Sequence, residues 1–123
     1  MKVRIVSTKF GRVILDSNDV ETKYQHDVVI LADGSVQKRP KHLSKEKYGT
    51  SHIVSMEEIE YVLQVPTQRL MIGTGMFNRV TLSEEAELLL EKNDVEVTMV
   101  PTNRMASEWN TLDKASAIIH TTC

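Results

Sequence analysis

The sequence predicts an α/β domain of three layers, in which helices flank a central mixed β-sheet and an N-terminal β-hairpin forms an additional layer. Three observations support this class. Extended segments dominate the N-terminal third, and short apolar runs alternate with amphipathic helical patterns in the C-terminal half. The run Leu70 to Ile72 is continuously apolar, as in a strand that is covered on both faces.

Composition limits the number of domains and the compartment. A chain of 123 residues fits one domain with one hydrophobic core, so residues 1–123 are expected to form a single domain. The single cysteine, Cys123, cannot form an intramolecular disulfide, which favours a cytoplasmic location. The N-terminal residues alternate apolar and polar side chains and lack the apolar segment of a signal peptide or membrane helix, so we expect no membrane association.

The first elements are extended. Residues 2–7 and 11–16 are predicted as two short strands. Segment 27–39 is also extended, and Asp33-Gly34 divides it. This dipeptide tolerates the two positive φ angles of a type I′ turn, so we predict a hairpin with a two-residue turn.

A short helix is predicted over residues 56–64. Ser55 is followed three residues later by Glu58, which is a capping box, and Val54 is placed to contact Ile59 as a hydrophobic staple. One face of this helix is apolar and carries Met56, Ile59, Val62 and Leu63. The opposite face is polar, and we expect its side chains to be exposed: Glu57, Glu58, Glu60 and Gln64.

From there strands and helices alternate. We predict a central strand at 69–73, a helix at 83–93, an edge strand at 95–100, a helix at 103–112 and a last strand that begins at Ala115. Asn93 is expected to take the left-handed conformation at the end of the first of these helices.

Gly73-Thr74-Gly75 follows the central strand at the end of the sheet where ligands bind in open α/β folds. The third glycine of a dinucleotide motif is missing, because Asn78 stands there, and the next helix begins only near Ser83. Two interpretations remain open: a loop that binds a ligand, and a tight bend that turns the chain.

No catalytic, cofactor or metal motif is evident. Ser51 lies beside His52, but Ile53 occupies the place of the second glycine in a nucleophile elbow. His120 and Cys123 are three residues apart on a strand, so their side chains leave opposite faces. We expect His120 to be hydrogen-bonded near the end of the sheet.

Segment 38–49 is the one strongly charged region. Its lysines and arginine exceed its single acid, Glu46, by four charges in a chain whose net charge is −2, so the remainder carries −6. This segment is either a solvated loop or a docking place for an anion or an acidic partner. The pI of about 6.1 and the lack of interleaved aromatic residues disfavour nucleic acid as a partner.

Several short motifs occur in a characteristic order: "KYGTSH" at 47–52, Gly-Thr-Gly at 73–75, "VPT" at 100–102, Trp109-Asn110 and "AIIHTTC" at 117–123. Together they resemble the Mth-type domain family, whose biochemical function is unassigned. The resemblance implies a three-layer fold around a mixed sheet and no established activity. One member is associated with adipogenesis, and a more distant one is an assembly factor for a mitochondrial respiratory complex. Trp109 stands where the family usually has tyrosine.

Two functional hypotheses follow. The preferred one is a non-catalytic protein-interaction or assembly module with a protein partner, and it predicts an exposed apolar patch of several hundred Å². The alternative is a binder or enzyme for a small anionic ligand, held between the glycine segment and the basic segment 38–47. The sequence leaves self-association open and indicates no cofactor. The candidate residues for a ligand or partner site are Lys45, Lys47, Tyr48, His52, Gly73, Thr74 and Gly75.

Overall fold

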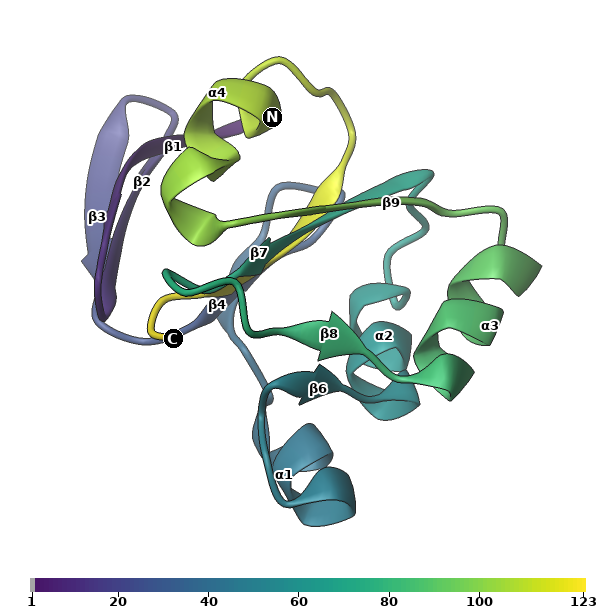
Figure 1. The fold of residues 1–123 in the computed structure, drawn as a ribbon. Coiled ribbons are helices and arrows are strands. Elements are labelled where there is room, and N and C mark those ends of the chain that lie inside the picture. Colours follow the sequence, from purple (N-terminus) through teal and green to yellow (C-terminus); the bar gives the residue numbers. More distant parts are fainter. Residues whose placement is uncertain (1) are drawn as a thin grey trace.

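The computed structural model describes residues 2–123 and has three layers (Figure 1). The central layer is a five-stranded mixed sheet in which β10, β7 and β9 are parallel and β4 and β5 pair antiparallel. This arrangement confirms the predicted fold class. In spatial order the strands are β5 (Val36–Lys38), β4 (Val28–Ile30), β10 (Ser116–His120), β7 (Arg69–Thr74) and β9 (Glu96–Val100).

The N-terminal layer is a separate antiparallel sheet of three strands, β1 (Val3–Lys9), β2 (Arg12–Ser17) and β3 (Val20–Tyr24). The sequence predicted only the first two. In β3 the residues are mostly exposed and polar, so the strand shows no apolar alternation from which to predict it. The other two strands bury Val3, Ile5, Val13 and Leu15 against the central sheet.

Helices cover both faces of the central sheet (Figure 1). α4 (Met105–Trp109), which follows a 3₁₀ turn η1 (Thr102–Arg104), lies with the N-terminal sheet on one face. α2 (Met56–Val62) and α3 (Glu84–Lys92) lie on the other face. The short parallel pair β6 (Ile53–Val54) and β8 (Thr81–Leu82) precedes these two helices.

The central sheet separates two apolar clusters, which corrects the expectation of one core. Successive residues of one strand belong to different clusters: Met71 lies with the N-terminal sheet, and Leu70 and Ile72 lie with α2 and α3. The same alternation occurs in β10, where Ile118 and Ile119 face opposite sides. Burial on both faces explains why these strands are continuously apolar.

Part of the basic segment is helical, where the sequence predicted a loop or docking segment. α1 (His42–Tyr48) ends at Gly49, whose φ of 73° is left-handed and whose N–H donates to the Lys45 carbonyl. The helix carries no apolar stripe, since Ser44 is its one buried residue, and hydrophobic periodicity therefore gave no sign of it.

Three local predictions were wrong. The 28–38 hairpin exists, but its loop runs from Leu31 to Ser35 with only Gly34 at positive φ, so the turn is not type I′. Asp94, and not Asn93, takes the left-handed conformation after α3. Ser55 caps α2 by accepting from the Glu58 N–H, but the Glu58 side chain is buried at 1% exposure instead of lying in solvent.

Candidate functional site

The glycine segment lies at the carboxyl end of β7, packed against η1 and the C-terminal residues. The Gly75 N–H donates to Thr102 Oγ1 at 2.8 Å, and the Met76 N–H donates to the Thr122 carbonyl at 2.7 Å. A Cβ on Gly75 would lie 2.5 Å from the Cys123 carbonyl oxygen, and φ at Gly75 is 96°. The glycines therefore allow a close approach of backbone to backbone, which favours the tight-bend interpretation.

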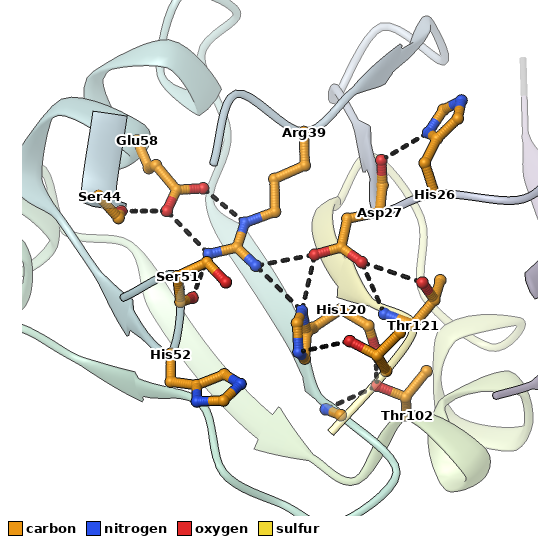
Figure 2. Close-up of polar contacts among 12 residues, drawn as sticks. His26, Asp27, Arg39, Ser44, Ser51, His52, Glu58, Thr102, His120 and Thr121 are labelled. Atoms are coloured by element: carbon orange, nitrogen blue, oxygen red, sulfur yellow. Dashed lines mark hydrogen bonds and ion pairs between the residues drawn. The ribbon is translucent and has the colours of Figure 1, made fainter. Parts of the chain in front are cut away.

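A buried ionic network lies beside this bend, centred on Arg39 (Figure 2). The Arg39 guanidinium donates from Nε to Glu58 Oε1 at 2.7 Å and from Nη2 to Glu58 Oε2 at 2.8 Å. It also donates from Nη1 to Asp27 Oδ2 at 2.9 Å and from Nη2 to the Ser51 carbonyl at 2.8 Å. One guanidinium thus joins the end of β5 to α2 and to the start of β4.

Asp27 is held as a carboxylate by the same network. It accepts from His120 Nδ1 at 2.7 Å, from the Thr121 N–H at 2.9 Å and from Thr121 Oγ1 at 3.0 Å. Burial alone would raise the pKa of Asp27, but the hydrogen bonds from His120 and Thr121 and the positive charge of Arg39 outweigh burial, so its pKa lies well below the usual value.

The charges of Arg39 and Glu58 also have hydrogen-bond partners within the network. Burial would lower the pKa of Arg39, but the hydrogen bonds and charge of Glu58, followed by those of Asp27, raise it. Ser44 donates a further hydrogen bond from Oγ to Glu58 Oε2. Every charge in this group therefore has a partner, as buried ions require.

His120 connects the buried network to the C-terminal residues. Its Nδ1 faces Asp27, which assigns the proton to that nitrogen, and its Nε2 lies 3.3 Å from Thr122 Oγ1. The expectation of a hydrogen-bonded His120 near the sheet end is confirmed. His120 is only 2% exposed, so its ring is closed to a substrate from solvent.

His52 lies beside the His120 imidazole ring, and Cys123 lies beside His52. The His52 ring meets the His120 ring edge-on, with centroids 5.3 Å apart, and His52 Nε2 lies 4.0 Å from Cys123 Sγ. Burial lowers the pKa of His52, and its electrostatic interactions with His120, Arg79 and Arg39 lower it further. Among residues 2–123, no three His, Cys, Asp or Glu side chains are arranged to hold a metal ion.

The structure separates the two halves of the predicted anion site. His52 and the glycine segment lie beside His120, whereas Lys45 lines a depression that contains no residue of the glycine segment. Lys47 pairs with Glu57 at 3.3 Å and with Glu85 at 3.4 Å, and it also lies 5.7 Å from the centre of the Tyr48 ring. Thr74 Oγ1 donates to the Val100 carbonyl at 3.1 Å.

Sequence reasoning missed Asp27, Arg39 and Glu58 as a group. Their positions were treated as part of a hairpin, of a basic segment and of a solvated helix face. The only signal was the presence of His120 at the end of a buried apolar strand, which implies a hydrogen-bonding partner but does not say which.

An exposed aromatic pair lies on two loops near the same end of the sheet. Phe10, in the β1–β2 turn, is 61% exposed, and Phe77, in the loop after β7, is 65% exposed. Their ring centroids are 6.2 Å apart. The Gly11 N–H donates to the Thr121 carbonyl at 2.7 Å and ties the first loop to the C-terminal residues.

Over residues 2–123, none of the helices has the length and apolar character needed to span a bilayer.

Comparisons with known proteins identify the family. No family model matches the chain, and no curated protein does. Among solved structures, the conserved hypothetical protein PH1505 from Pyrococcus horikoshii OT3 is 35% identical, with 100% of each chain covered and a TM-score of 0.86. The protein MT938 is 28% identical over 99% of this chain and 100% of its own, with a TM-score of 0.81. A Mth938-like domain from Bordetella pertussis shares the fold at 18% identity, with a TM-score of 0.60 over 96% of this chain and 85% of its own.

The identity to PH1505 over the full length of both chains, and the resemblance to MT938, agree with the motifs recognised in the sequence. The chain belongs to the Mth938-like domain family.

Proposed function

We propose that this protein is a non-catalytic interaction or assembly module that docks a protein partner on the patch formed by Phe10 and Phe77. One observation carries the proposal: two phenylalanines from separate loops contact each other while more than half of each side chain faces solvent. Exposed apolar groups that gather in this way mark interaction sites, and aromatic anchors supply much of the energy at protein interfaces.

The charges around the patch indicate the chemistry of the partner. Lys9 and Arg12 flank Phe10 and Gly11, Arg79 follows Phe77 by two residues, and segments 8–12 and 76–79 contain no acidic residue. We therefore propose a partner that presents apolar side chains within an acidic rim. A second copy of the chain in a two-fold dimer would bring the same positive charges together, which disfavours self-association through this patch.

The buried network supports the non-catalytic role. Arg39, Asp27 and Glu58 satisfy one another and His120 is enclosed, so we assign this group to holding the layers together. The alternative function, in which the glycine segment holds a small anion, has less support because the N–H groups of Gly75 and Met76 already donate to the protein.

We place the interaction in the cytoplasm, on the ground that the sequence contains a single cysteine.

The test is affinity capture with matched variants. The Phe10→Ser, Phe77→Ser double variant removes both rings, and Val20→Ser is the control because Val20 is 63% exposed on β3, away from the two loops. The proposal expects a partner that wild type and Val20→Ser retain, that the double variant loses, and that is released more easily as salt rises.

A photoreactive amino acid at position 77 then shows by cross-linking whether the captured protein touches the patch through acidic and apolar segments. Capture of no stable partner by wild type across growth conditions would contradict the proposal. So would a partner that the double variant retains as well as wild type does.

A further inference from the structure

A depression of about 440 Å³ lies where β5 leads into α1, and three lysines are among the residues that line it. Among the residues that the structure describes, no acidic one lines it. Within residues 2–123, its lysines form no ion pair, in contrast to Lys47. The full lining is Lys38, Arg39, Pro40, Lys41, His42 and Lys45.

The wall of this depression is fixed before any ligand arrives. The Lys41 N–H donates to the Arg39 carbonyl at 2.9 Å, the Leu43 N–H to the Pro40 carbonyl at 3.1 Å and the Lys45 N–H to the Lys41 carbonyl at 3.0 Å. On the inner side, the Arg39 guanidinium points away into the buried network, where it is fully enclosed (Figure 2). A preorganised wall lowers the cost of binding.

The positive field of the depression is local. Asp27 and Glu58 together carry −2 against the +1 of Arg39, so Arg39 adds no net positive charge and the field comes from the three lysines, which carry +3 in a chain of net charge −2 and leave −5 on the rest. Nucleic-acid binders present an extended basic stripe, which this distribution does not form. The volume is that of a small-molecule site.

We propose that this depression binds a small phosphate-bearing anion, such as the phosphate ester of a small organic molecule. Three lysines around one small space match a group that carries two or more negative charges on several oxygen atoms, and lysine binds phosphate as a point charge. The Pro40 ring and the methylene stems of the lysines offer apolar surface to the organic part of such an ester.

The test uses inorganic pyrophosphate as the probe, measured by calorimetry and by NMR chemical shifts at low ionic strength. We expect saturable binding with shifts centred on residues 38–45. The Lys38→Glu, Lys45→Glu variant should weaken binding at least about tenfold, because two attractive charges become repulsive. Both lysines are exposed, so the variant should fold, and Lys45→Glu alone is the reserve if it does not.

The matched control is Lys23→Glu, which reverses an exposed lysine of β3 outside the depression and should leave binding within about twofold of wild type. Phe10→Ser, Phe77→Ser should bind pyrophosphate as wild type does, because the proposal is independent of the aromatic patch. The absence of saturable binding at millimolar pyrophosphate would overturn the inference, as would an equal loss in Lys23→Glu. Citrate binding as tightly as pyrophosphate would overturn the phosphate class, and tighter binding of a short oligonucleotide would reassign the lysines to nucleic acid.

Discussion

Replacing Arg39 with methionine would leave two buried carboxylates without their cation. The side chains of Arg39, Asp27 and Glu58 are 0%, 3% and 1% exposed. Removing one member of such a buried pair costs about 3–5 kcal/mol, against a total free energy of unfolding of about 5–15 kcal/mol for a domain. Arg39→Met should therefore lose a large part of the stability of the protein.

Urea unfolding followed by fluorescence measures this loss, since Trp109 is the single tryptophan and is buried at 4% exposure. With a slope of about 2 kcal/mol per M, the urea midpoint should fall by about 1.5–2.5 M. The control is Lys38→Met at the adjacent exposed position, which should change the free energy of unfolding by less than about 0.5 kcal/mol.

The pH dependence distinguishes ion pairing from loss of packing. The pKa of Asp27 is lowered in the folded state, so its stabilisation is present above the unfolded-state pKa of about 3.9 and is lost as pH falls through the acid range. In Arg39→Met the unpaired carboxylates are better tolerated once protonated. The difference in free energy of unfolding between wild type and variant should therefore become smaller from pH 7 towards pH 3. A difference below about 1 kcal/mol at pH 7, or one that grows as the pH falls, would refute the reasoning.

Three further predictions concern single side chains. Gly75→Ala should lower the free energy of unfolding by at least about 2 kcal/mol, because it combines a positive φ with a clash against the Cys123 carbonyl. The control Gly49→Ala has the positive φ but meets open space, so it should lower this free energy by only about 1 kcal/mol. Equal losses of the two variants in urea unfolding would contradict this. Asn110→Ala removes the amide that bonds both the N–H and the carbonyl of Ile5, so it should cost about 1–3 kcal/mol and speed hydrogen exchange of the Ile5 amide; unchanged exchange would count against it. The lowered pKa of His52 means that the unfolded chain takes up the proton first, so wild type should lose stability as pH falls below about 6.5 and His52→Asn should lose less; parallel curves would exclude this contribution.

The layers could be predicted because they depend on burial patterns within short segments. Leu70 to Ile72 and Ala117 to Ile119 are apolar without interruption, and each lies in a strand covered on both faces. Ser55 begins its helix by accepting the N–H group three residues later, as the sequence around this serine indicates. Local chemistry was sufficient at these positions.

The buried charges could not be predicted, because their environment depends on partners distant in sequence. Arg39 is 12 residues from Asp27 and 19 from Glu58, and His120 is 93 from Asp27. Periodicity assigns a glutamate such as Glu58 to a polar face, and nothing nearby in the sequence indicates a buried arginine as its partner. The glycine segment shows the same limit, since the groups that fill its space, Thr102 and Cys123, come much later in the chain.

The alternation of side chains between the two faces of the central sheet also affects how the sequence can change. Met71 sits next to Leu70 in the chain, yet the two belong to separate packing environments on opposite faces. Substitutions at neighbouring positions of β7 should therefore have almost independent effects on stability during evolution. Leu70 and Leu90 belong to one cluster, so the side-chain volumes at these two positions are expected to change together. An engineer could redesign one half of the interior as a module and leave the opposite half untouched.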